Sequence, residues 1–170
     1  MTLLSVKELD VTFGTPGKNY VEAAKDVSFD LEPGETVALV GESGSGKCVS
    51  ALSILGLLPY PHAQHPKGSV LFEGQELLGA SEETLRSIRG NEISMIFQEP
   101  MTALNPLHSV EKQISEPLMI HQKLARRQAR ARILELLQLV GFGDGANRLA
   151  AFPHQLSGGQ RQRVMIAMAL

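Results

Sequence analysis

The feature that most constrains the fold of this chain is the stretch 41–48, which reads Gly-Glu-Ser-Gly-Ser-Gly-Lys-Cys. Its spacing is that of the phosphate-binding loop G-x-x-x-x-G-K-[ST], with a thiol in place of the final hydroxyl. The short apolar run 36–40 precedes it and is typical of a buried parallel strand. Residues 48–58 read as a helix that Pro59 and Pro61 end. This strand–loop–helix order predicts an α/β fold built around a phosphate-binding loop.

The composition of the loop suits phosphate chemistry. Glycines at 41, 44 and 46 let the backbone curl so that successive N–H groups point inward at phosphate oxygens. A helix that starts near Lys47 adds its positive dipole end, and the lysine supplies a flexible charge for the outer phosphates. The alternative is a glycine-rich turn with an exposed lysine, but the flanking strand and helix favour the functional interpretation.

Residue 48 departs from the motif, because a hydroxyl oxygen normally contacts Mg²⁺ at that position. Mg²⁺ prefers oxygen ligands in octahedral geometry, whereas thiols suit softer metals. We therefore expect phosphate binding to survive and metal binding to weaken at Cys48. Two alternatives stay open: a small side chain that fits with water in the metal position, and a redox-sensing thiol.

Composition narrows the class of protein. The chain has 170 residues, 43% of them hydrophobic, which suits a globular domain with a real core. A net charge of −2 argues against a general polyanion binder, and the single cysteine excludes an intrachain disulfide and fits a reducing compartment. Residues 1–10 lack the apolar core of a signal peptide, and the longest apolar run is far short of the ~20 residues that cross a bilayer. We expect a soluble, cytoplasmic chain that relies on other subunits for any membrane part.

The remaining elements change character near residue 100. Before it, the patterns predict strands at 3–13, 27–31 and 93–97, a turn at 14–19, a strand–turn–strand unit at 68–78 and a helix at 81–88. After it, they predict helices at 110–122 and 127–140 and a last helix from near Ser157. The chain therefore reads as α/β at the start, followed by a helical insertion.

One apolar stripe marks the helix at 127–140. Ile133, Leu136, Leu137 and Val140 are spaced i, i+3, i+4 and i+7. Gly141 follows as a reasonable C-terminal cap. This stripe is the candidate core of the helical part.

A second motif, Leu-Ser-Gly-Gly-Gln (LSGGQ) at 156–160, lies at the expected start of the last helix. Ser157 followed by two glycines at a helix start forms a second anion-binding end. Such an end need not face the loop of its own chain and could complete a site across a dimer interface. The alternative is that Ser157 is an ordinary N-cap.

In this order and spacing, the phosphate loop, Phe-Gln-Glu-Pro at 97–100 and LSGGQ resemble the ATP-binding subunit of an ATP-binding-cassette (ABC) transporter across essentially the whole chain. The stretches 41–47, 95–106 (MIFQEPMTALNP) and 153–170 (PHQLSGGQRQRVMIAMAL) are most similar to the subgroup that serves oligopeptide, dipeptide and nickel importers. The resemblance implies a P-loop NTPase core with a small antiparallel β subdomain and a helical insertion.

The resemblance also implies how the chain divides. Residues 1–35 and 66–80 would form the β subdomain, 36–58 and 91–98 the nucleotide-binding core, 101–156 the helical subdomain, and 157–170 the start of the helix after LSGGQ.

Each matching position has an implied role. Phe13 would stack on adenine, with Tyr20 as the weaker candidate, although Phe13 could instead be a core aromatic. Gln98 would reach the metal and the attacking water, and with Lys47 it would be catalytic; the alternative for Gln98 is a strand-terminal polar residue. The metal would be contacted at Cys48 and Gln98. The phosphates of ATP would be bound by Gly41, Glu42, Ser43, Gly44, Ser45, Gly46, Lys47, Cys48 and Val49, and the γ-phosphate held by a partner domain would be contacted by Ser157, Gly158, Gly159 and Gln160.

The implied cofactors are ATP and Mg²⁺. The implied partners are a second ABC ATPase domain, identical or different, transmembrane permease subunits and, indirectly, an extracytoplasmic solute-binding protein; no nucleic acid partner is expected. The expected location is the cytoplasmic face of the cell membrane, and the expected activity is ATP-driven import of peptides or related small solutes.

In the family, an apolar strand ending in Asp-Glu and a later histidine follow LSGGQ and complete the hydrolytic site. Neither can be placed on this sequence, which runs to Leu170, and His154 beside LSGGQ is expected to be structural. We therefore expect a fragment truncated before the Asp-Glu strand, or a decaying gene. We also expect the 170-residue chain alone to be poorly stable and unable to hydrolyse ATP, because a central strand is missing.

Two other function classes stay open. One is a non-catalytic or decayed ABC domain that binds ATP without turnover, which Cys48 favours. The other is a DNA-acting ATPase of the same superfamily, for which the basic run Lys123, Arg126, Arg127, Arg130 and Arg132 could touch phosphate backbones. That run could equally be a solvated helix face, and the sequence has neither the zinc cysteines nor the long coiled coils of such relatives.

Overall fold

Two long strands pair along most of their length at the start of the chain. In the computed structural model, which describes residues 2–15, 18–99 and 103–170, β1 (Leu4–Thr15) runs antiparallel to β2 (Lys18–Leu31). β2 starts well before the expected strand at 27–31, because β1 offers backbone partners as far as Thr15, which lies opposite Lys18. The chain divides into two compact units, Met1–Arg86 and Ser87–Leu170, and each is described by itself.

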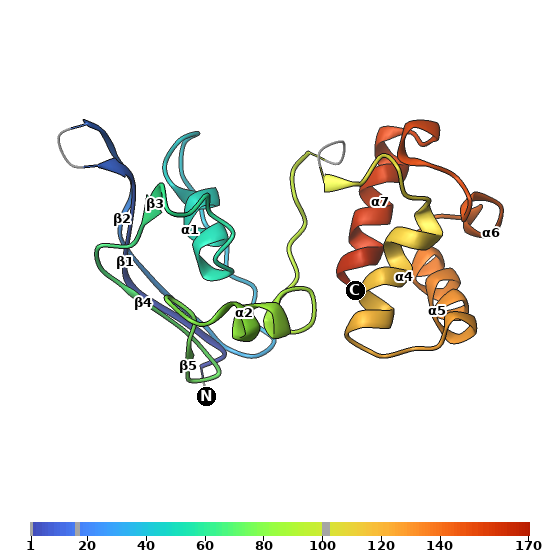
Figure 1. The fold of residues 1–170 in the computed structure, drawn as a ribbon, viewed down its shortest axis with the longest axis horizontal. Coiled ribbons are helices and arrows are strands. Elements are labelled where there is room, and N and C mark those ends of the chain that lie inside the picture. The colour runs from blue at the N-terminus through green and yellow to red at the C-terminus, as the bar shows by residue number, and fades with distance from the viewer. Residues whose placement is uncertain (1, 16–17, 100–102) are drawn as a thin grey trace. The chain divides into compact units, whose positions relative to one another are not determined.

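The first unit is an antiparallel sheet in the order β2-β1-β4-β5, with β3 paired to the far end of β1 (Figure 1). The short strands are β3 (Ala63–Gln64), β4 (Ser69–Phe72) and β5 (Gln75–Glu76). Val6, Leu9, Val11 and Val70 are completely or almost completely buried in this unit. The strand–turn–strand unit expected at 68–78 is confirmed, and so is the antiparallel β part of the fold.

Two helices, α1 and α2, begin in this unit. α1 (Lys47–Ile54) packs against β1 and β2. It ends earlier than the helix expected at 48–58, because the chain turns at Gly56, whose φ is 59°. α2 (Glu82–Ile88) begins after Ser81, whose hydroxyl accepts a hydrogen bond from the N–H of Thr84 at 3.2 Å.

The second unit is helical. It contains α4 (Val110–Ile120), α5 (Arg126–Leu139), the short α6 (Gly145–Arg148), a 3₁₀ turn at Pro153–Gln155 and α7 (Gly158–Ala169). The two helices expected at 110–122 and 127–140 are therefore confirmed with small shifts at their ends. α5 ends before Gly141, which has φ 72° and donates its N–H to the carbonyl of Gln138.

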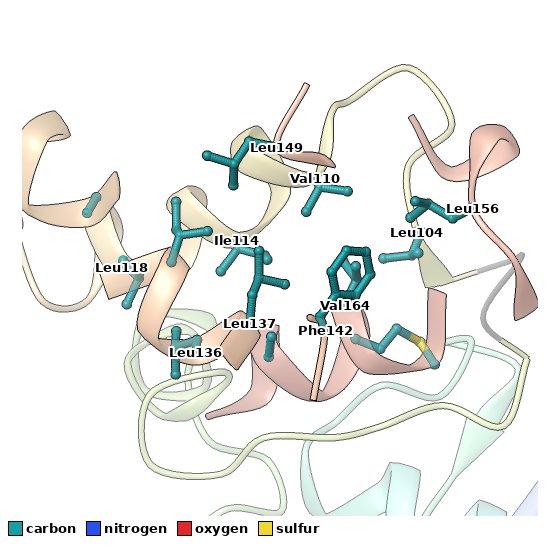
Figure 2. Packing of buried hydrophobic residues seen from close by; sticks show 14 residues of the cluster. Leu104, Val110, Ile114, Leu118, Leu136, Leu137, Phe142, Leu149, Leu156 and Val164 are labelled. Atoms are coloured by element: carbon teal, nitrogen blue, oxygen red, sulfur yellow. The ribbon is translucent and has the colours of Figure 1, made fainter. Parts of the chain in front are cut away.

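Apolar side chains from α4, α5 and α7 meet in one core. Figure 2 shows Ile114 of α4, Leu137 of α5 and Val164 of α7 pointing into the same cluster. The expected stripe on α5 supplies part of it, since Ile133, Leu136 and Leu137 are buried and Val140 packs at the edge. The hydrophobic periodicity of this region therefore predicted its packing correctly.

Two segments expected to be strands are irregular, and those two predictions are wrong for this structure. Residues 36–40 carry no strand, and Val40 is 92% exposed. Residues 93–97 form no named strand and one bridge, between Arg89 and Ile93, and the Phe97 side chain is exposed. A parallel strand needs backbone partners beside it, and within the described parts of the chain these two segments have no strand ladder.

Some expectations fall on residues outside the described ranges. These are residues 16–17 of the turn expected at 14–19, and residues 100–102 of the stretch 95–106. Within the described residues, none of the helices combines the length and the hydropathy needed to cross a membrane.

Candidate functional site

The loop 41–46 leads directly into α1, as its sequence predicts. Gly46 is the N-cap of the helix and Gly44 lies in the loop, and both have left-handed φ values, 86° and 83°. Residues with a Cβ rarely adopt this backbone conformation, which explains the glycines at these two positions. The left-handed backbone of the loop therefore occurs at two of the glycines that the motif contains.

Lys47 closes the loop on itself. Its ammonium group donates hydrogen bonds to the carbonyl oxygens of Gly41 and Glu42, both at 2.6 Å, and to the hydroxyl of Ser45 at 3.0 Å. These oxygens come from both arms of the loop, so the cation lies within its curve. A positive charge is thereby held where the loop meets the start of a helix.

The junction between loop and helix is fixed on the sheet. A Cβ added at Gly46, which is buried, would overlap the backbone oxygen of Ala23 in β2 and lie 3.1 Å from the Cβ of Ala24. The hydroxyl of Ser50 donates to the carbonyl of Gly46 at 3.0 Å. These supporting residues could not be predicted from the sequence, because two alanines in a strand and a serine one turn into a helix carry no motif signal. The small side chains of Ala23 and Ala24 are consistent with a close approach of Gly46, but the sequence does not show that these residues meet.

The electrostatics of the helix start favour an anion. α1 has no acidic residue in its first turn and its N-cap glycine has no side chain to satisfy the first N–H groups. The rest of the loop, from Gly41 to Ser45, is exposed, and so is Cys48. The N–H groups at the helix start, the positive end of the helix dipole and Lys47 together form a receptor for negatively charged oxygens.

The aromatic candidates lie on the paired strands of the same unit. Phe13 is half-buried on β1, opposite Val21 of β2 and Ala63 of β3. Tyr20 is exposed on β2. Both rings therefore offer accessible surface, and the choice between them as a stacking partner stays a prediction.

In the second unit, the LSGGQ turn forms the start of α7. Ser157 is the N-cap: its hydroxyl accepts from the N–H of Gln160 at 3.3 Å, and the side-chain oxygen of Gln160 accepts from the N–H of Ser157 at 2.9 Å. This reciprocal pair is a capping box. Gly158 and Gly159 are exposed, with open space where a Cβ would stand. The alternative of an N-cap role for Ser157 is thus confirmed, while contact with a partner's phosphate stays a prediction.

Gln98 lies on the irregular segment before residue 100, and its side chain is exposed. It belongs to the second unit, whereas the phosphate loop belongs to the first. The strand that was expected to end at Gln98 is irregular, so its alternative as a strand-terminal residue loses its basis. Its contact with water or metal stays a prediction.

The basic run on α5 is partly neutralised. Arg130 pairs with Glu111 at 3.6 Å, and Arg132 pairs with Glu135 at 3.0 Å. Such surface pairs reduce the positive field that a phosphate backbone would meet. This supports a solvated helix face rather than a nucleic-acid surface.

A phosphate-binding loop at the start of one helix and an LSGGQ cap at the start of another define the nucleotide-binding domain of an ATP-binding cassette. The family model described as "ABC transporter" matches residues 24–170, and the chain belongs to this family. The expectation drawn from the three motifs is confirmed.

The curated relatives are named as ATP-binding proteins of transport systems. The chain is 61% identical to the "Peptidoglycan transport ATP-binding protein YejF" of Agrobacterium fabrum, over 99% of the chain and 31% of that protein. It is 50% identical to the "Oligopeptide transport ATP-binding protein OppD" of Bacillus subtilis, over 99% of the chain and 47% of that protein. The chain therefore spans between about a third and a half of the length of these relatives.

Solved structures agree on the fold. The dimeric structure of the ATP-binding cassette MJ0796, in a post-hydrolysis state with ADP and Pi bound, superimposes with a TM-score of 0.85 at 29% identity, over 98% of this chain and 68% of that one. The ABC ATPase fold class expected from the sequence is thereby confirmed.

Magnesium does not fit the donor atoms that this loop presents. The motif places a hydroxyl at position 48 for Mg²⁺, and the chain has a thiol there. Mg²⁺ takes hard oxygen ligands, and sulfur is a soft one. Among the described residues there is no group of three or more His, Cys, Asp or Glu side chains that could hold a metal ion instead.

Proposed function

We propose that this chain is the ATP-binding part of the subunit that powers import of peptides or related small solutes across the cytoplasmic membrane. The observation that carries the proposal is the position of Lys47, held by three oxygens of the loop at the N-terminus of α1. ATP phosphates would replace those oxygens as partners of the ammonium group. The oligopeptide transport name of the relative from Bacillus subtilis supports the substrate class.

The residues of the loop bind and orient the triphosphate in this proposal. The backbone N–H groups of residues 41–49 would donate to phosphate oxygens, and Lys47 would neutralise the outer phosphates. Phe13, or Tyr20 in its place, would stack on adenine. The fixed seat of Gly46 on Ala23 and Ala24 holds the cradle in one position, so little ordering is required when the ligand binds.

The second unit would act on a partner. The exposed Gly158 and Gly159, beside the cap of Ser157 and Gln160, would meet the γ-phosphate of ATP held by a second ABC ATPase domain. Gln98 would orient the attacking water and transmit movement to permease subunits, which an extracytoplasmic solute-binding protein supplies. ATP would then join the two domains, and its hydrolysis would release them. The site lies, in this proposal, at the cytoplasmic face of the membrane.

The proposed division of the chain follows these roles. It assigns 1–35 and 66–80 to a β subdomain, 36–58 and 91–98 to the nucleotide-binding core, 101–156 to the helical subdomain and 157–170 to the start of the helix after LSGGQ.

Uptake of a labelled peptide tests the proposal. The protein that carries this chain is expressed in cells from which its own gene has been deleted, either unchanged or with Lys47→Ala. Lys25→Ala is the matched control, because Lys25 is an exposed lysine on β2 that pairs with Glu22. We expect Lys47→Ala to abolish uptake and Lys25→Ala to retain it. Normal uptake with Lys47→Ala would overturn the proposal.

A further inference from the structure

The phosphate loop differs from a magnesium-binding loop at one side chain. Cys48 is the second residue of α1 and is exposed. Its sulfur replaces the hydroxyl oxygen that the motif provides for Mg²⁺. Because Mg²⁺ demands oxygen ligands in near-ideal octahedral geometry, the loop lacks its own ligand for this ion.

Two neighbouring hydroxyls, those of Ser45 and Ser50, form hydrogen bonds within the loop and the helix start. The Ser45 hydroxyl accepts a hydrogen bond from the Lys47 ammonium group at 3.0 Å. The Ser50 hydroxyl is buried and donates to the carbonyl of Gly46. Both groups hold the loop in shape, so neither is positioned to take over the role of residue 48.

The phosphate cradle does not depend on the side chain at 48. It rests on the seat of Gly46 against β2, on the three hydrogen bonds of Lys47 and on the N-terminus of α1. None of these contacts involves the sulfur. Phosphate binding and magnesium binding, which the motif normally combines, are therefore separable in this chain.

We infer that this loop binds the phosphates of ATP directly, and that its affinity for ATP depends little on Mg²⁺. The inference rests on the proposed function, because it assumes that ATP is the ligand of the loop. In this inference, the thiol at position 48 is the reason why ATP binding depends less on Mg²⁺ than it does in a loop with a hydroxyl there.

Calorimetric titration of the full chain with ATP tests the inference, once in excess EDTA and once in excess Mg²⁺. The native protein is expected to give similar dissociation constants in both buffers. Cys48→Ser restores the oxygen and is expected to bind about tenfold more tightly with Mg²⁺ than without it, the effect of one contact to a charged group. Thermal melting of both proteins establishes that they fold alike.

Cys48→Ala provides the matched comparison, because it removes the sulfur without adding an oxygen. It is expected to respond to Mg²⁺ as weakly as the native protein. An equal Mg²⁺ response in the native protein and in Cys48→Ser would overturn the inference, as would a native response that Cys48→Ala loses. Absence of ATP binding by every form in both buffers would instead overturn the proposed function itself, and the inference with it.

Discussion

The ammonium nitrogen of Lys47 lies 2.6 Å from the carbonyl oxygen of Gly41, six residues earlier in the chain. This hydrogen bond joins the first residue of α1 to the first residue of the phosphate loop. A second bond of the same length, to Glu42, fixes the same end. The oxygens of the loop therefore hold a cation within its curve, where a phosphate could contact it.

Gly46 and Gly44 have similar backbone angles but different surroundings, which makes them a matched pair. Either one replaced by alanine adds a left-handed non-glycine residue, at a cost of about 1 kcal/mol. Gly46→Ala also overlaps the backbone of Ala23, whereas a Cβ at Gly44 meets open space. We expect Gly46→Ala to lower the free energy of unfolding by about 1–3 kcal/mol more than Gly44→Ala.

Urea unfolding of the two variants measures this difference. The comparison also tests the seat of the loop on β2, since an Ala23 oxygen that can move aside would make both losses equal. Equal losses would contradict a fixed loop–sheet junction.

Leu137 and Leu139 test the core of the helical unit, because they lie on the same helix with opposite exposure. Leu137 is 0% exposed within the cluster of Figure 2, and Leu139 is 71% exposed. Leu137→Ala should reduce the free energy of unfolding by about 2–5 kcal/mol, and Leu139→Ala by less than about 0.5 kcal/mol. Chemical unfolding followed by the helical circular dichroism signal would show it, and similar effects of both changes would rule out the packing described here.

The sequence predicted most of what depends on local pattern. The stripe of Ile133, Leu136 and Leu137 indicated the buried face of α5. The spacing of apolar residues along a helix defines that face without knowledge of the elements that pack against it. The loop 41–48 was predictable for the same reason, since glycine spacing and Lys47 define its shape locally.

The features that could not be predicted from the sequence depend on residues that are distant in the chain. The apolar run 36–40 resembles a buried strand, but a strand exists only when another strand satisfies its backbone groups. The length of β2 was underestimated because β1 supports it through residues with no alternating pattern. The packing of Gly46 against Ala23 and Ala24 is a tertiary contact, so no local motif predicts it.

Ser157 caps α7 and, in the proposed function, also contacts a partner's γ-phosphate; one pair of variants separates these two roles. Its hydroxyl caps α7, so Ser157→Ala should lower stability by about 1 kcal/mol. Ser157→Asp keeps a capping oxygen but places a negative charge where the proposal puts a partner's γ-phosphate. We expect Ser157→Asp to retain stability and to lose ATP-dependent association.

Sedimentation velocity with and without ATP measures that association, beside thermal melting of each variant. If Ser157→Asp associates with ATP as the native protein does, then Ser157 is only a helix cap and the partner contact is wrong.

Glu76 makes the stability of the first unit depend on pH. Partial burial raises the pKa of Glu76, but hydrogen bonds from the Ser69 hydroxyl and from the N–H groups of Val70 and Leu78 outweigh it, so the pKa is lowered from 4.5. The unfolded state thus binds a proton at higher pH than the folded state does. The contribution is fully present above about pH 4.5 and is lost as the pH falls through the lowered pKa of the folded protein.

Unfolding midpoints in urea, measured as the pH is lowered from neutral into this acidic range, test the effect. The native protein should lose stability more steeply than Glu76→Gln, which cannot ionise at that position. Parallel curves for the two proteins would show that the three hydrogen bonds do not favour the ionised carboxylate.

The most direct test of the whole account is the affinity of the full chain for ATP, measured by calorimetry in the native protein, in Lys47→Ala and in Lys25→Ala. If the loop is the ATP site, the native protein and Lys25→Ala bind alike, and Lys47→Ala binds about tenfold to a hundredfold more weakly. If Lys47→Ala binds ATP as well as the native protein does, the loop 41–48 is not the nucleotide site and the central claim is wrong.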